Sequence, residues 1–188
     1  RRFYIFCSKP TFMSFSLPKY LAKRMFPNGE SYYLVRKDGS PTPNYIMFQS
    51  LNIIMPIEVP FPGLENFNFS DLPNYADITI DGHPLKITAE RFKNDILYIY
   101  KDHYFNAEYI ERFISGQNVD SYIIPLGARS SLLIKIQEDL THATTIGEHQ
   151  FKVKIHFGII EINVDVAFEL TPENANRDFN SIEIQSDL

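Results

Sequence analysis

Residues 151–168 have the sequence FKVKIHFGIIEINVDVAF, and this stretch decides the fold. Apolar and polar side chains alternate on both sides of Gly158-Ile159, which is the pattern of two strands with one buried face each. A glycine at the first central position favours a two-residue type II′ turn, so we predict an antiparallel hairpin. The register on its buried face then pairs Phe157 with Ile160, Ile155 with Ile162, Val153 with Val164 and Phe151 with Val166. On the solvent face the same register pairs His156 with Glu161 and Lys152 with Asp165.

Other short apolar stretches extend the β pattern over most of the chain. The predicted strands are residues 31–36, 45–55, 76–80, 85–88, 96–100, 122–126 and 132–136. Consecutive apolar positions in 45–55 indicate a strand covered on both faces. Apolar spacing predicts a helix over 17–25, and Asn106 is expected to cap a second helix that Gly116 ends. We therefore predict a mainly β fold, an antiparallel β sandwich (Ig-like or jelly-roll-like) with one or two short helices.

Length and composition predict one domain with an added segment at each end. The chain has 188 residues, of which 44% are apolar and 22% charged, as in ordinary globular domains. We assign 1–16 to a basic N-terminal extension, 17–170 to the β-sandwich domain and 171–188 to a C-terminal tail, in which Ile182 and Ile184 are candidates for a last edge strand. No apolar run approaches the roughly 18 residues of a membrane span, so we expect a soluble protein.

Charge is distributed unevenly along the chain. Six basic residues and no acidic one precede residue 28, whereas the rest of the chain has 12 basic against 23 acidic residues. Such an arm can contact nucleic acid, an anionic lipid surface or the acidic face of another subunit, or it is a solvated extension. Because the body is acidic, we expect a protein partner or self-association and no nucleic acid. The single cysteine, Cys7, cannot close an internal disulfide, which favours a reducing, cytoplasmic location.

The five histidines are candidate metal ligands. His142, His149 and His156 recur every seven residues, but strand periodicity places His149 on the core face and His156 on the solvent face. One strand cannot direct both side chains at a single ion, so no metal site is predicted there. We also find no glycine-rich phosphate loop, GxSxG, HExxH or paired-cysteine motif, and we expect neither a cofactor nor, on balance, catalysis.

A group of aromatic and loop residues is the remaining candidate site. His83 and His103 follow predicted strands, so they can meet at one end of a sandwich, where loops often carry binding sites. Asp102 lies next to His103, and nearby tyrosines can stack on sugar rings or bases. Turn formation by the Asp-Gly-His-Pro sequence and ordinary core packing of the tyrosines are the alternative interpretations. The candidate ligand-binding residues are His83, Tyr98, Tyr100, Asp102, His103 and Tyr104.

Four segments carry a resemblance to known proteins, namely LPKYLAKRMFPNGES, ADITIDGHPL, IPLGARSSLLIKI and IGEHQFKVKI. In these segments the chain resembles small uncharacterised prokaryotic β-sandwich proteins and, more distantly, the β subunit of C-glycoside deglycosidases. The resemblance implies a small subunit that packs beside a larger catalytic one, and it carries over no catalytic residue. The segment from Phe105 to Gly116 and the basic arm have no counterpart in it.

Three functions are therefore considered. The first is a non-catalytic β-sandwich interaction or assembly module that forms a homo- or hetero-oligomer. The second is an accessory or catalytic subunit of a carbohydrate-active enzyme of the C-glycoside-cleaving type. The third is a module that binds a small molecule or sugar through the tyrosine cluster.

Overall fold

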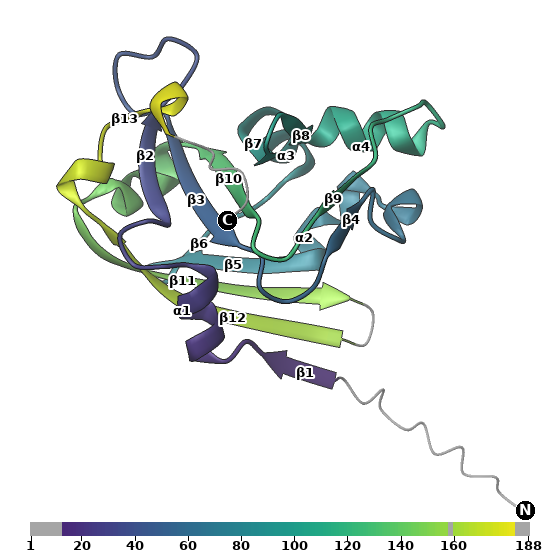
Figure 1. The fold of residues 1–188 in the computed structure, drawn as a ribbon, viewed down its shortest axis with the longest axis horizontal. Helices are drawn as coiled ribbons and strands as arrows, with labels where there is room; N and C mark the ends of the chain where they lie inside the picture. The colour runs from purple at the N-terminus through teal and green to yellow at the C-terminus, as the bar shows by residue number, and fades with distance from the viewer. Residues whose placement is uncertain (1–12, 158–159, 183–188) are drawn as a thin grey trace, which may run out of the picture.

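The computed structural model describes residues 13–157 and 160–182, which form two β sheets and a short ribbon (Figure 1). The five-stranded sheet has the order β1-β12-β11-β5-β6, with the bounds Met13–Ser16, Ile160–Leu170, Gly147–Phe157, Ala76–Ile80 and His83–Pro84. The six-stranded sheet has the order β13-β2-β3-β10-β7-β8, with the bounds Arg177–Asp178, Tyr32–Arg36, Tyr45–Leu51, Arg129–Lys135, Ile96–Tyr100 and His103–Phe105. The ribbon pairs β4 (Ile57–Val59) with β9 (Tyr122–Ile124). The fold is mostly β, as predicted.

Short helices connect the strands. The α-helices are α1 (Lys19–Met25), α2 (Leu72–Tyr75), α3 (Ala89–Asp95) and α4 (Ala107–Ile114), and the 3₁₀ helices are η1 (Leu64–Asn66), η2 (Phe69–Asp71), η3 (Glu138–Thr144), η4 (Pro172–Asn174) and η5 (Phe179–Ser181). Helix α1 lies within the predicted helix at 17–25. The predicted cap of α4 is confirmed, because Asn106 Oδ1 accepts the backbone N–H of Tyr109 at 3.0 Å. Helix α3 was not predicted; it begins where Thr88 Oγ1 accepts the N–H of Arg91.

The hairpin of β11 and β12 has the predicted register. All four apolar pairs and both solvent-face pairs lie opposite each other as expected. The predicted turn at 158–159 lies outside the described residues. Burial is greatest far from the turn, where Val166, Phe168 and Leu170 are buried, whereas Val153 and Ile162 are only half-buried. The covering layer is therefore thickest over the end of the hairpin that is remote from the turn.

The two sheets pack face to face around an aromatic centre. Phe168 of β12 lies against Phe26, Tyr32, Phe48 and Phe151, with ring centroids 5.2 to 5.9 Å apart. These rings come from both sheets and from the segment after α1, so Phe168 joins three parts of the chain. The alternating pattern of the hairpin thus supplies one wall of the main core.

Strand β3 is covered on both faces, as its continuous apolar run predicts. Ile46 and Phe48 pack into the core between the sheets. Met47 points to the opposite face, where it is fully buried in a cluster that includes Leu133 and Ile182. Part of the C-terminal segment therefore covers the outer face of the six-stranded sheet.

Several expectations differ from the structure. The sheets are mixed rather than wholly antiparallel, because β1 pairs in parallel with β12 and β13 pairs in parallel with β2. Residues 13–16, assigned to the N-terminal extension, form β1, and the C-terminal tail supplies β13. Residues 85–88 are not a strand; β6 is His83–Pro84, and Leu85 is buried in the core instead. Ile184 lies outside the described residues, and Ile182 is buried but not in a strand.

Within the described ranges, no helix has the length and apolar character that crossing a membrane requires.

Replacing Phe168 by alanine tests the aromatic centre. Phe168 is 4% exposed and contacts four rings, so we expect Phe168→Ala to lower the free energy of unfolding by about 3–5 kcal/mol, through lost burial and the cavity left behind. Phe15→Ala in the same sheet is the control, because Phe15 is 55% exposed and should change stability by less than about 0.5 kcal/mol. Urea denaturation measures both variants, and equal losses would contradict the assignment of Phe168 as the packing centre.

Candidate functional site

A polar pocket of about 240 Å³ lies between β8, α4 and the start of β9. Carboxylates, aromatic rings, an amide and a guanidinium group line it, supplied by Asp102, His103, Tyr104, Asn106, Glu108, Tyr109, Arg112, Asp120 and Tyr122. We call this cavity the polar pocket. It brings together Asp102, His103 and Tyr104, three of the residues predicted from sequence.

Local sequence explains how the polar pocket is built. Strands β7 and β8 form a tight hairpin in which Tyr100 pairs with His103, so Lys101 and Asp102 are the turn. Lys101 has φ of 54°, the left-handed conformation that such turns require. The next residue after β8 is the capping Asn106, which starts α4 at once. Helix α4 is thereby held beside the β7–β8 hairpin, and its first turns line the pocket.

Stacked rings form one wall of the polar pocket. The ring of His103 stacks on that of Tyr122 with centroids 4.3 Å apart and planes 9° apart. Tyr122 in turn stacks on Tyr100, which is 4% exposed, at 6.1 Å. The stack therefore runs from the core out to His103, which is partly exposed.

Burial favours the protonated form of the Tyr109 and Tyr122 phenols. Burial raises the pKa of Tyr122 far above its ordinary value of 10, and the neighbouring Tyr109 and Tyr98 add to the increase. Burial also raises the pKa of Tyr109, with a smaller contribution from Asp120. Tyr109 already donates its hydroxyl proton to the carbonyl oxygen of Asp120 at 2.6 Å. The Tyr122 hydroxyl is buried and has no hydrogen-bond partner among the described residues.

The polar pocket is lined by more acidic than basic side chains. Asp102, Glu108 and Asp120 line it together with a single guanidinium, that of Arg112. Arg112 donates one hydrogen bond to the carbonyl oxygen of Asn118 at 2.8 Å, which holds the guanidinium in place. Nε2 of His103 lies 3.8 Å from an Asp102 oxygen. The pocket thus has acceptors and a held guanidinium donor beside an aromatic wall.

The other predicted residues lie elsewhere. Tyr100 is beneath the ring stack, and Tyr98 lines a separate apolar groove described below. His83 belongs to β6 of the other sheet, where its ring lies 4.4 Å from that of His142. The structure therefore does not place His83 with His103.

Sequence reasoning missed several residues of the polar pocket. Glu108 and Arg112 are spaced by one helical turn, and this i, i+4 spacing places both on one face of α4. That spacing was a usable signal of a shared surface. Tyr122 and Asp120 had no such signal, because their approach to β8 depends on how the β4–β9 ribbon packs.

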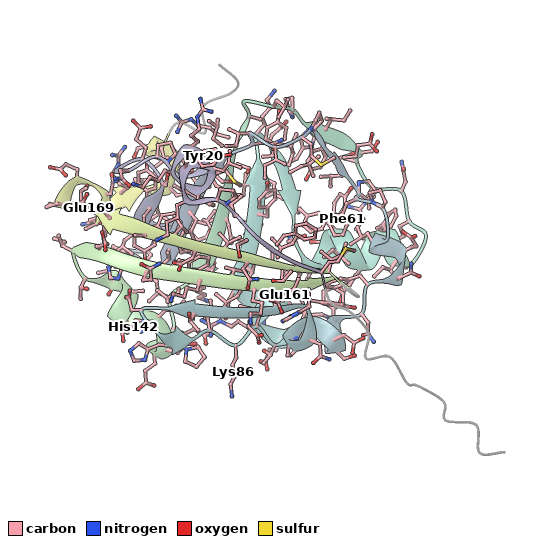
Figure 2. All side chains as sticks on the ribbon, turned by 90° about the horizontal axis from the view of Figure 1, so that it is seen from below. Tyr20, Phe61, Lys86, His142, Glu161 and Glu169 are labelled. Carbon is pink, nitrogen blue, oxygen red and sulfur yellow. The ribbon has the colours of Figure 1, made fainter. Side chains whose placement is uncertain are left out.

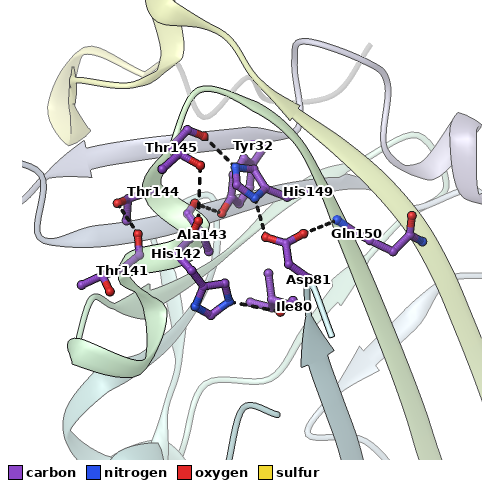
Figure 3. A network of polar contacts seen from close by, with 10 residues as sticks. All are labelled: Tyr32, Ile80, Asp81, Thr141, His142, Ala143, Thr144, Thr145, His149 and Gln150. Atoms are coloured by element: carbon purple, nitrogen blue, oxygen red, sulfur yellow. Dashed lines mark hydrogen bonds and ion pairs between the residues drawn. The ribbon is translucent and has the colours of Figure 1, made fainter. Parts of the chain in front are cut away.

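A second polar network surrounds the buried His149 (Figure 3). Nδ1 of His149 lies 2.7 Å from Asp81 Oδ2, and Nε2 lies 2.7 Å from the carbonyl oxygen of Thr145. Both ring nitrogens therefore lie within hydrogen-bond distance of an oxygen. Asp81 Oδ1 also accepts the backbone N–H of Gln150 at 2.8 Å. An Asp–His pair of this kind resembles a catalytic dyad, but both ring nitrogens already have partners. The pair instead ties η3 and the β5–β6 turn to β11.

The three histidines at positions 142, 149 and 156 do not converge on one site. His149 is 4% exposed, which confirms its predicted place on the core face. His156 lies on the opposite face, with Nε2 3.2 Å from Asp77 Oδ2. His142 Nε2 lies 3.1 Å from the carbonyl oxygen of Ile80. Among the residues that the structure describes, no group of three or more His, Cys, Asp or Glu side chains has the geometry to hold a metal ion.

Comparisons of the chain with protein-family models, curated proteins and solved structures gave no match. Function is therefore inferred from the pockets and surfaces of the molecule itself.

The pH dependence of stability tests the Asp81–His149 pair. Burial alone raises the pKa of Asp81, but hydrogen bonds from His149 and Gln150, with the charges of His149 and His142, hold it below its ordinary 3.8. A carboxyl whose pKa is lowered on folding stabilises the protein above that ordinary value, and this contribution disappears as pH falls through the lower folded value. We expect the difference in unfolding free energy between wild type and Asp81→Asn to shrink between pH 6 and pH 3. Asparagine tolerates the φ of 52° at this position, so the backbone is kept.

Urea denaturation at stepped pH measures this difference. Asp77→Asn is the control, because it removes an exposed acid from β5, the strand that leads into Asp81. A wild-type advantage over Asp81→Asn that stays constant to pH 3 would contradict the role of the Asp81 charge.

Proposed function

We propose that the protein is a non-catalytic binding module that holds a sugar-sized, polyhydroxylated ligand in the polar pocket. One observation carries this proposal: the stacked His103–Tyr122 wall lies in one pocket with three carboxylates and a guanidinium group. The cavity of about 240 Å³ lies below the usual range for drug-sized ligands, which favours a ligand with a single ring.

The chemistry of a sugar ring matches these groups. Its C–H face packs on an aromatic ring, and Tyr104, which lines the pocket and is 50% exposed, offers such a surface. Its hydroxyls both donate and accept hydrogen bonds. Glu108 and Asp120 accept, and Arg112 donates, so one ring can satisfy both kinds of group.

The type of fold that carries the polar pocket is also part of this proposal. We interpret the two packed sheets as a β-sandwich scaffold, Ig-like or jelly-roll-like in type, whose loops and ribbon at one end carry the binding site. A cytoplasmic location and the lack of a nucleic-acid partner stay predictions.

Binding of monosaccharides tests this function. We expect at least one of glucose, galactose and mannose to raise the melting temperature of the wild-type protein and to give a binding isotherm by calorimetry. Glu108→Gln removes one charged acceptor, which is worth about 1.5–3 kcal/mol, so the affinity should fall roughly 10- to 100-fold. Tyr104→Ala should lower affinity by removing the exposed ring. Tyr20→Ala is the matched control, because Tyr20 is 66% exposed on α1 and does not line the pocket.

Two outcomes would overturn this proposal. One is the absence of stabilisation by every sugar tested, and the other is an equal loss of affinity in Tyr20→Ala.

Release of aglycone from a C-glycoside would instead favour the carbohydrate-active enzyme subunit. In that case His103→Ala should abolish turnover and His83→Ala, outside the pocket, should not.

An assembly module is the second candidate function, and two adjoining loops favour it. The side-chain nitrogen of Asn52 lies 2.8 to 3.1 Å from the carbonyl oxygens of Met55, Ile124 and Pro125, which joins residues 52–56 to 124–128. We call these ten residues the Asn52 loop pair. Ile54, Met55 and Leu126 are more than half exposed, and none of the ten residues is charged. Two copies of an acidic body can meet there without like charges in contact.

Light scattering after size exclusion tests assembly through the Asn52 loop pair. We expect the wild-type mass to rise with concentration toward that of a dimer and Ile54→Ser/Leu126→Ser to remain monomeric. Ile146→Ser is the control, since Ile146 is 61% exposed in another part of the chain. A monomeric wild type at every concentration would contradict self-association.

A further inference from the structure

An apolar groove of about 310 Å³ lies between the β4–β9 ribbon and the six-stranded sheet. Every lining side chain is aliphatic or aromatic, and the lining includes Ile57, Val59, Phe61, Phe105, Ile124 and Leu132. Val59 and Ile124 are buried, and Leu132 packs against the main core, so the floor of the groove is part of the folded interior. The groove is independent of the polar pocket.

The rim of the groove exposes apolar area to water. Ile57 is 40% exposed and Phe61 37% exposed, and the ring of Phe61 lies 5.7 Å from that of Phe105. Covering such side chains is favourable by about 25 cal/mol per Å² of apolar area. Tyr98 is the one lining residue with a polar side-chain group, so the groove fits apolar side chains rather than a polar ligand.

The chemistry of residues 1–12 matches the groove and its surroundings. This segment, RRFYIFCSKPTF, lies outside the described residues and contains four consecutive large apolar side chains at positions 3–6. It also carries Arg1, Arg2 and Lys9 and no acidic residue. Glu58 and Glu65 lie close to Phe61 in sequence and are both exposed, so acidic groups accompany the apolar rim.

The segment joins the fold within reach of the groove. Met13 pairs with Ile160, the first residue of β12, and Ser14 pairs with Glu161. Figure 2 shows Glu161 and Phe61 toward the same end of the molecule, away from His142 and Glu169. Twelve residues span at most about 40 Å when extended, so the length permits a return to the groove.

We propose that residues 3–6 dock in the apolar groove of the same molecule. Their aromatic and aliphatic side chains cover Ile57 and Phe61, and the flanking basic residues lie near Glu58 and Glu65. The N-terminal segment thus acts as an intramolecular cover for this face of the β4–β9 ribbon.

The single cysteine provides a direct test in the full chain. Cys7 directly follows the apolar residues 3–6, and a nitroxide attached to it broadens NMR signals of nearby methyl groups. We expect loss of the Ile57 and Ile124 methyl signals and retention of those of Leu140 and Ala143, which lie beside His142 at the other end of the molecule. Phe3→Ser/Phe6→Ser should restore the lost signals, whereas Phe15→Ser, in β1, should not.

Two results would overturn the proposal. The first is retention of the Ile57 and Ile124 signals in the labelled wild-type protein. The second is broadening that occurs only between copies, seen when nitroxide-labelled protein without isotopes is mixed with isotope-labelled protein without nitroxide. Neither result depends on whether the polar pocket binds sugar, so this test and that of the proposed function fail separately.

Discussion

The alternation of apolar and polar residues in β11 and β12 is the constraint on which the structure depends. Because side chains point to opposite faces in turn, the pairing of Phe151 with Val166 commits the large apolar residues of the two strands to one side. That side must be covered, and the six-stranded sheet covers it through Tyr32 and Phe48. The positions of β7, β8 and β10 follow from this packing, and with them the position of the polar pocket.

Sequence predicted the elements whose signals are local. The hairpin register, the doubly covered β3 and the Asn106 cap each depend on a pattern within one short segment. Strands β1 and β13 have no such signal, because strands of four and two residues form only where a sheet edge already exists. The stretch 85–88 was misassigned because Leu85 and Ile87 alternate as in a strand, yet both pack into the core from an irregular segment.

The candidate site also contains residues that a local sequence signal predicted and residues that have no such signal. Asp102, His103 and Tyr104 are neighbours in sequence, so their shared location was predictable. His83 and His103 both follow strands, but nothing in their local sequence tells that these strands belong to different sheets. The stacking of His103 on Tyr122 joins residues far apart in the chain, and it depends on where the β4–β9 ribbon lies. A long-range contact of this kind is fixed by tertiary packing and leaves no local pattern.

The sites of His149 and His103 differ in how far neighbouring groups occupy the hydrogen-bonding atoms of the ring. At His149 a carboxylate and a carbonyl occupy both ring nitrogens, and the ring is 4% exposed. The bonds there tie together three segments, so any ligand would have to break them. At His103 the ring is held by stacking on Tyr122, and its Nε2 lies 3.8 Å from an Asp102 oxygen. Stacking fixes the ring without using its nitrogens for hydrogen bonds, and the nearby Arg112 guanidinium is held by its bond to the Asn118 carbonyl oxygen. A binding site requires groups that are positioned in advance and still unpaired, and in the described part of this chain the polar pocket meets that requirement where the His149 network does not.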